Sequence, residues 1–172
     1  MEPLFINKFR HTKESYIEMN MKYSQFTRIF FGLLFFIAFG SLSAFGYFVL
    51  YDWVYTVVLG VLAVIFSFYP TFRIRFLAKR REKILLEMYG VVPENVIMFY
   101  DETIMATSLT NKAETKLEYG KIKKVTQSKN MYLLILSKGV VLMVDKKSFE
   151  KGNCEEFEKF ITEKSVIAKI KL

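Results

Sequence analysis

The chain has 172 residues, of which 52% are hydrophobic, and its formal net charge is +8. Six basic residues and one acidic residue fall within residues 73–83, so the positive charge is local and gives little support to nucleic-acid binding by the whole chain. The only cysteine, Cys154, excludes an internal disulfide and fits a reducing compartment.

Residues 1–28 are predicted to form a strand and a helix. The alternating run from Phe5 to Arg10 is typical of a strand. Thr12 is a candidate N-cap for a helix that begins at Lys13. His11, the only histidine, has no serine or cysteine context that marks a nucleophile, so we expect it to be a solvent-exposed residue at the helix entry.

Two apolar runs follow, at residues 29–50 and 53–72, and each is long enough to cross about 30 Å of hydrocarbon as a helix. Asp52, the only charged residue between them, is flanked by Tyr51 and Trp53, and aromatic residues are enriched at membrane interfaces. A cleaved signal peptide is disfavoured, because the first run is long and the second follows at once. The pattern predicts a transmembrane helical hairpin over residues 29–72, with a buried hairpin of a soluble protein as the alternative.

Small residues recur along the hairpin and allow helices to approach closely. The small residues expected to take part in helix packing are Gly32, Gly40, Ala44 and Gly60. They favour packing of one span against the other, and dimerisation is the second interpretation. Pro70 is predicted to kink the second span or to mark its exit from the membrane.

Residues 73–90 are predicted to form a basic juxtamembrane helix with Gly90 as its C-cap. Because basic residues flank both spans on one side, the positive-inside rule places both termini in the cytoplasm. The segment lacks interleaved aromatic residues where its charges are densest, so we expect no nucleic-acid partner. Its basic residues are expected to fix the topology and to contact anionic lipid: Arg73, Arg75, Lys79, Arg80, Arg81 and Lys83.

Residues 91–172 change to a pattern of short strands, predicted at 96–100, 103–110, 115–128 as one or two strands, 131–137 and 140–145. Lys138 and Gly139 are predicted to close the last hairpin. A helix with Asn153 as N-cap and Glu156 at its third position follows, and the residues after 164 are weakly specified. The fold class is therefore α+β: a membrane hairpin with a small antiparallel-sheet domain closed by a C-terminal helix.

The chemistry-bearing side chains of this domain support no catalytic, metal or cofactor site. Cys154 has no partner cysteine and no nearby histidine, so it is read as a residue of the helix's first turn. A second basic surface is formed in sequence by Lys121, Lys123 and Lys124. These lysines either contact anionic lipid or lie on an edge strand, where they block strand addition.

The features that carry a family resemblance are the two spans, the basic segment, Tyr119 with the spaced Ile122 and Val125, the run MYLLIL, and the motif VDKKSF before a Phe-rich helix. In these features the chain resembles the YcxB-like family of bacterial membrane proteins. The resemblance extends over essentially the whole chain. It implies a pleckstrin-homology-like fold for residues 91–172 and no established activity, cofactor or substrate. Asp145 is a departure, because the family often has proline there.

We therefore expect a non-enzymatic, multi-pass membrane protein whose cytoplasmic domain is an interaction module at the inner leaflet. Its partners would be the bilayer, an anionic lipid, and a protein partner or a second copy of the chain. The alternative is immunity or stress protection against membrane-active peptides of the bacteriocin type. An enzyme acting on lipid is disfavoured because no nucleophile, metal set or phosphate loop is recognisable.

Overall fold

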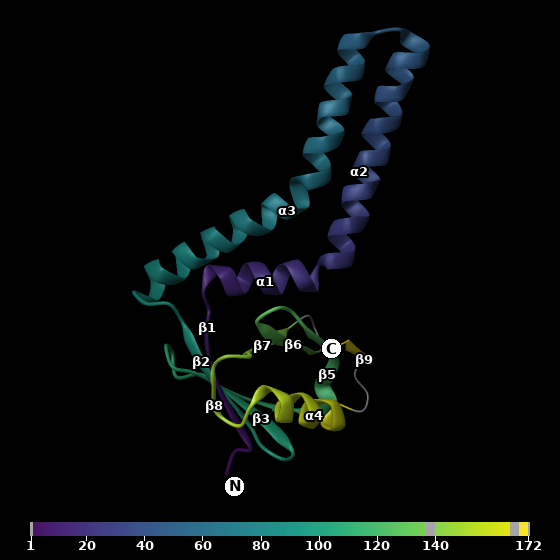
Figure 1. The fold of residues 1–172 in the computed structure, drawn as a ribbon. Helices are drawn as coiled ribbons and strands as arrows, with labels where there is room; N and C mark the ends of the chain where they lie inside the picture. The colour runs from purple at the N-terminus through teal and green to yellow at the C-terminus, as the bar shows by residue number, and fades with distance from the viewer. Residues whose placement is uncertain (1, 137–139, 166–168, 172) are drawn as a thin grey trace. The chain divides into compact units, whose positions relative to one another are not determined.

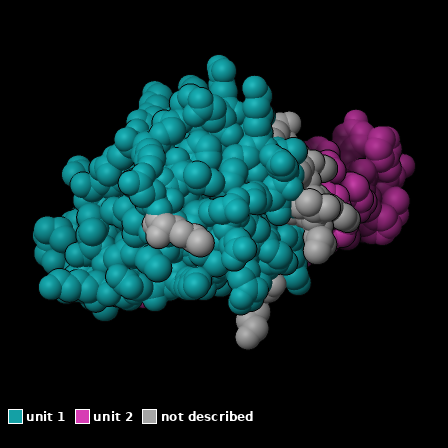
Figure 2. Space-filling model, turned by 90° about the horizontal axis from the view of Figure 1, so that it is seen from below, with its two compact units in different colours: residues 1–19, 81–172 teal, residues 20–80 magenta. Residues whose placement is uncertain are grey.

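The computed structural model describes residues 2–136, 140–165 and 169–171 and has an α+β fold (Figure 1). The predicted turn at Lys138 and Gly139 lies outside the described residues. The chain divides into two compact units, shown in teal and magenta in Figure 2. One unit consists of residues 1–19 and 81–172, and the other consists of residues 20–80.

The second unit contains the predicted helical hairpin. Helix α2 (Gln25–Phe45) continues into a π-helical turn at Gly46–Leu50, and helix α3 (Trp53–Tyr89) begins after a short turn. The Asp52 carboxylate accepts hydrogen bonds from the backbone N–H groups of Val54 and Tyr55, both at 3.0 Å, and so caps α3. Only 6% of the apolar stretch of each helix is buried, and by length and composition both helices are able to cross a membrane.

Small residues allow the two helices of the hairpin to approach closely at several levels. A Cβ added at Gly32 would lie 3.0 Å from the carbonyl oxygen of Ser67, and one at Gly60 would lie 3.5 Å from the Ser43 hydroxyl. The Ser43 hydroxyl itself donates to the carbonyl of Thr56 at 2.7 Å. Gly40 behaves differently, because a Cβ there meets no atom within 4 Å, and the nearby Ala44 is exposed.

Helix α3 does not end at the limit of the apolar run. Pro70 lies inside it, and the predicted helix over the basic segment is its continuation. The helix stops at Tyr89, where Gly90 takes a positive φ of 71° and its N–H donates to the Leu86 carbonyl at 2.8 Å. That geometry confirms Gly90 as the C-cap.

The first unit is built from two sheets and a C-terminal helix. The first sheet has the strand order β4-β3-β2-β1-β8, where the strands are β1 (Phe5–Arg10), β2 (Glu94–Phe99), β3 (Thr103–Ser108), β4 (Glu114–Glu118) and β8 (Phe149–Lys151). The second has the order β7-β6-β5-β9, where the strands are β5 (Ile122–Gln127), β6 (Met131–Leu136), β7 (Val141–Asp145) and β9 (Lys169–Lys171). The pairs within these sheets are antiparallel except for β5 and β9, which run parallel.

Strand β1 lies inside the first sheet, between β2 and β8, although the hairpin separates it from both in the sequence (Figure 1). It pairs with β2 from Phe5 opposite Phe99 to Arg10 opposite Glu94. Phe5, Asn7 and Phe9 are buried and alternate with less buried residues, which is the pattern that the sequence predicted. The compact unit therefore joins the N-terminal strand to the domain predicted at residues 91–172.

Aromatic rings form the centre of the core. Phe157 of helix α4 (Cys154–Lys164) is fully buried, and its ring centroid lies 4.8 Å from that of Phe99 and 5.5 Å from those of Phe5 and Tyr132. Asn153 caps α4 by accepting a hydrogen bond from the Glu156 N–H at 2.9 Å, as predicted.

One buried polar side chain connects the two sheets. Asn7 of β1 is fully buried, and its side-chain amide donates to the carbonyl of Asp145 at 2.7 Å. Its carbonyl oxygen accepts from the N–H of the same residue at 3.1 Å. Asn7 thereby satisfies both backbone groups of the last residue of β7.

Candidate interaction site

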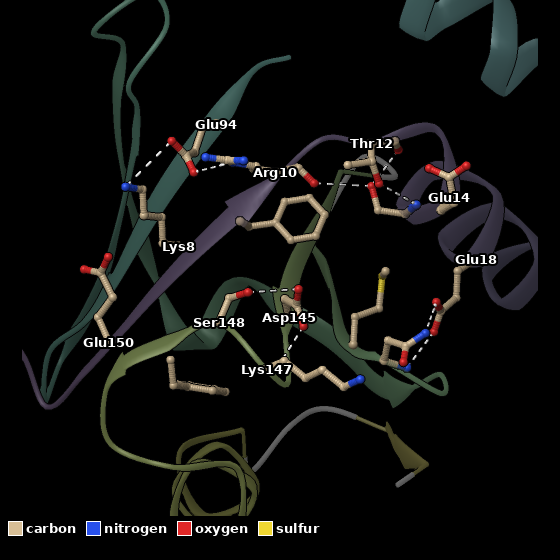
Figure 3. Close-up of a pocket in the computed structure, with 15 residues that line it drawn as sticks. Lys8, Arg10, Thr12, Glu14, Glu18, Glu94, Asp145, Lys147, Ser148 and Glu150 are labelled. Carbon is tan, nitrogen blue, oxygen red and sulfur yellow. Dashed lines mark hydrogen bonds and ion pairs between the residues drawn. The ribbon is translucent and has the colours of Figure 1, made fainter. Parts of the chain in front are cut away.

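A polar cavity of about 670 Å³ opens in the first unit and is bordered by β1, the first turns of α1 (Lys13–Tyr23) and the β7–β8 connection (Figure 3). Charged side chains of both signs line it: Lys8, Arg10, Glu14, Glu18, Glu94, Asp145, Lys147 and Glu150. Phe9 and Met131 supply buried apolar surface within the same lining. The cavity is large enough to receive a short peptide segment or a lipid headgroup.

Many of the lining charges are already held by neighbours (Figure 3). Glu94 lies 2.9 Å from the Arg10 guanidinium and 3.8 Å from the Lys8 ammonium. Glu18 accepts hydrogen bonds from the backbone and the side chain of Asn130 at 2.7 and 2.9 Å. Burial acts to raise the pKa of Glu18, but these hydrogen bonds outweigh it and lower the pKa overall. These contacts hold the charged side chains at defined positions around the cavity.

Part of the lining is a turn held by its own hydrogen bonds. Ser148 donates to the Asp145 carboxylate at 3.0 Å, and the same carboxylate accepts from the backbone N–H of Lys147 at 2.9 Å. These contacts are those of a turn that closes the connection between β7 and β8. Neither histidine nor cysteine is among the lining residues. Within the described residues, no group of three or more His, Cys, Asp or Glu side chains could hold a metal ion.

His11 lies beside this region in a stack of rings. Its ring is stacked on Tyr16 with centroids 5.6 Å apart and meets Phe9 edge-on at 4.9 Å. The guanidinium of Arg81 covers Tyr16 at 4.3 Å from its ring centroid. The His11 Nε2 lies 2.8 Å from the Asn95 amide nitrogen, while the buried Nδ1 has no hydrogen-bond partner.

The prediction that His11 is solvent-exposed is wrong, because the imidazole is half-buried. Burial and the nearby Arg81 charge lower the pKa of His11 from 6.5 to about 4. The imidazole is therefore neutral at physiological pH. Local pattern could not predict this, since the residues that contact His11 come from β1, α1 and β2.

All six basic residues of the α3 segment are exposed. Arg81 covers Tyr16, and Lys83 forms an ion pair with Glu87 at 3.6 Å one turn further along. The remaining four basic residues take part in no ion pair among the described residues: Arg73, Arg75, Lys79 and Arg80.

The second group of lysines does not lie on a free edge. β5 is flanked by β6 and β9, with Lys124 opposite Lys169, so the edge-strand interpretation is wrong for Lys124. Lys123 lies where the β5–β6 register shifts. Lys121 precedes β5 and forms an ion pair with Glu118 at 3.7 Å.

Cys154 is the first residue of α4, as predicted. Its thiol donates to the carbonyl oxygen of Lys146 at 2.8 Å, and burial raises the pKa of that thiol. A thiol held in this way is a poor nucleophile.

The residues that build the polar cavity were not predicted as a group. Lys8 and Arg10 were assigned only to a strand, and Glu18 only to a helix. Local spacing carries no signal for the cavity, because it forms only when β1 pairs with β2 and β8 and when Glu18 reaches Asn130, 112 positions away in the chain.

A search of curated proteins found no match to the chain. A family comparison matched residues 99–161 to the family described as YcxB-like protein. This range runs from the last residue of β2 into α4, covers less than half of the chain, and includes neither β1 nor the hairpin. Within it lie Tyr119, the MYLLIL strand and the VDKKSF motif, on which the resemblance was based. Residues 99–161 of this chain are a YcxB-like family domain.

Proposed function

We propose that this protein is a membrane-anchored interaction module. Helices α2 and α3 cross the bilayer as a hairpin, and the unit of residues 1–19 and 81–172 lies in the cytoplasm at the inner leaflet. That unit has a pleckstrin-homology-like fold of two sheets and a C-terminal helix. It docks a polar segment of a protein partner in the cavity bordered by β1, α1 and the β7–β8 connection, without catalysis.

The observation that carries the proposal is the position of β1. The strand before an exposed apolar hairpin and the strand after it pair directly, from Phe5 opposite Phe99 to Arg10 opposite Glu94. A chain that crosses a bilayer twice returns to the face on which it started, so this pairing is compatible with two spans. It is incompatible with one span or three, because β1 and β2 would then lie on opposite faces.

Orientation is supported by charge. Basic residues flank the hairpin where it joins the sheets, whereas the connecting turn contains Asp52 and neither lysine nor arginine. The positive-inside rule then favours a cytoplasmic location for the sheets. The exposure of Arg73, Arg75, Lys79 and Arg80 is compatible with contact to anionic headgroups.

Cysteine accessibility tests the anchoring and the orientation. In a Cys154→Ser background, single cysteines are introduced by Trp53→Cys at the hairpin turn and by Lys147→Cys in the cavity lining. In intact cells an impermeant maleimide should label position 53 only, and permeabilisation should add position 147. The reverse pattern would invert the orientation, and extraction of the parent chain by alkaline carbonate would exclude anchoring.

Site-specific crosslinking tests the docking function. A photoreactive amino acid is placed in the full chain in its native membrane, either at Glu150, which is exposed and lines the cavity, or at Glu114, which is exposed on β4 outside it. We expect a discrete crosslinked species from position 150 that is absent from position 114 and is lost on Lys147→Glu. The same species from both positions would refute the cavity as the docking site.

A further inference from the structure

A second cavity, of about 470 Å³, lies entirely within the hairpin unit. Two arginines, Arg28 of α2 and Arg73 of α3, line one part of it, and apolar side chains line another: Phe31, Phe35, Tyr69 and Pro70. The cavity lies beside the break between α1, which ends at Tyr23, and α2, which begins at Gln25, and Pro70 of the continuous helix α3 is among its lining residues.

Arg28 is held in this cavity without a full set of partners. Its guanidinium donates to the Thr71 hydroxyl at 3.3 Å and to the Met21 carbonyl at 3.4 Å, both of which are long hydrogen bonds. The Nε atom is buried and has no hydrogen-bond partner. A buried guanidinium N–H without an acceptor is costly, because its hydration has been removed and not replaced.

The charge of this cavity is also uncompensated within its unit. Asp52 is the only acidic residue among residues 20–80, and it caps the N-terminus of α3 at the opposite end of the hairpin. None of the ion pairs among the described residues involves Arg28 or Arg73. Two guanidinium groups beside one cavity are suited to bind a phosphate, whose oxygens accept pairs of N–H groups.

From this geometry we propose that the cavity binds an anionic phospholipid, with the phosphate between Arg28 and Arg73 and the first acyl methylenes against Phe31, Phe35, Tyr69 and Pro70. The assignment rests on the proposed membrane anchoring. Arg28 immediately precedes the first apolar span and Arg73 immediately follows the second, so both lie at the depth of the lipid phosphates. The apolar lining favours a lipid over a free phosphate, because a free phosphate has no apolar group to contact those side chains.

Lipid-selective quenching of a single tryptophan tests the proposal. Trp53, the only tryptophan, is replaced by Phe, and Phe31→Trp places the probe in the cavity wall. The full chain is reconstituted in phosphatidylcholine with a small fraction of either brominated phosphatidylglycerol or brominated phosphatidylcholine. We expect stronger quenching by the anionic lipid, and each of Arg28→Gln and Arg73→Gln is expected to lower this preference about fivefold.

Matched variants separate the site from general surface charge. Arg75→Gln removes an equally exposed charge from the same helix outside the cavity and should leave the preference unchanged. Arg28→Lys keeps the charge but loses the planar fork, so it should retain only part of the preference and controls for folding. An equal loss from Arg75→Gln, or no preference in the parent protein, would overturn the proposal.

Two further arms distinguish the failures. If millimolar inorganic phosphate abolishes the preference, the site binds free phosphate and the lipid assignment is wrong. If the probe-bearing chain resists carbonate extraction but shows no lipid preference, the anchoring proposal stands and this inference alone fails. If the chain is extracted, the anchoring fails and this inference fails with it.

Discussion

Replacing Asn7 tests whether the strand before the hairpin stabilises the domain after it. Asn7→Leu keeps the approximate volume of this fully buried side chain but removes its hydrogen bonds to the N–H and carbonyl of Asp145, at 3.1 and 2.7 Å. The N–H of Asp145 would then lose its partner, at a cost of about 1–3 kcal/mol, while its carbonyl would keep only the 3.3 Å hydrogen bond from the Ser148 N–H, so the two losses together cost about 3 kcal/mol. The added apolar surface of leucine offsets about 1 kcal/mol of that cost.

The net loss is therefore about 2 kcal/mol, which corresponds to roughly a thirtyfold change in an equilibrium constant. Hydrogen exchange on the full chain in lipid nanodiscs measures it without reversible unfolding. Amides of β6 and β7 that exchange through global opening of the unit should exchange about thirtyfold faster in Asn7→Leu.

Lys8→Gln is the matched control, because it changes the neighbouring residue on the same strand and removes only the 3.8 Å contact with Glu94. Exposed pairs of this kind contribute little, so exchange should change by less than about threefold. Unchanged exchange in Asn7→Leu would refute the reasoning, because it would mean that the Asn7–Asp145 contact contributes nothing to the cohesion of the two sheets.

Three other outcomes follow from the structure. The free energy of unfolding of the domain should fall by up to about 2–3 kcal/mol as pH falls from about 6.5 towards 4, because His11 is protonated in the unfolded chain but, with a pKa of about 4, stays neutral in the folded one. In urea unfolding, His11→Gln should reduce this dependence on pH, and an unchanged dependence would assign it to other groups. A fragment of residues 91–172 should show poor amide dispersion by NMR because it lacks β1, whereas adding residues 2–12 in trans should restore dispersion; a well-folded fragment would contradict the role of β1. Replacement by Gln of six basic residues of α3 should weaken or invert the membrane topology reported by C-terminal fusions: Arg73, Arg75, Lys79, Arg80, Arg81 and Lys83. An unchanged orientation would show that these residues do not determine the topology.

Local signals predicted most of the elements. The apolar runs, the alternation from Phe5 to Arg10 and the N-cap at Asn153 each depend on neighbours within a few residues, and the structure has the corresponding helix or strand in each case. Strands β8 and β9 were not predicted, because each has three residues, too few for a period to be recognised.

Local sequence pattern could not predict which strands pair when they lie far apart in the sequence. β1 was predicted as a strand, yet nothing within residues 5–10 indicates that its partners begin at Glu94 and Phe149. The errors on His11 and Lys124 have the same origin. His11 contacts residues from three other elements, and the strand that contains Lys124 is flanked by β9.

The hairpin also bears on the stability of the domain, because it connects two strands of one sheet. Joining β1 to β2 closes a loop over residues 11–93, and a flexible loop of that length would cost roughly 4 kcal/mol in closure entropy. Two helices that lie side by side return the chain to its starting level, and their formation in the bilayer would remove most of that cost before the strands meet. β1 is also synthesised before the hairpin but pairs with strands made after it, so the first sheet is completed only after the hairpin has been made. If the hairpin inserts in a bilayer as we propose, folding of the domain would be coupled to that insertion, and a chain that fails to insert would leave Phe5 and Phe9 without their core.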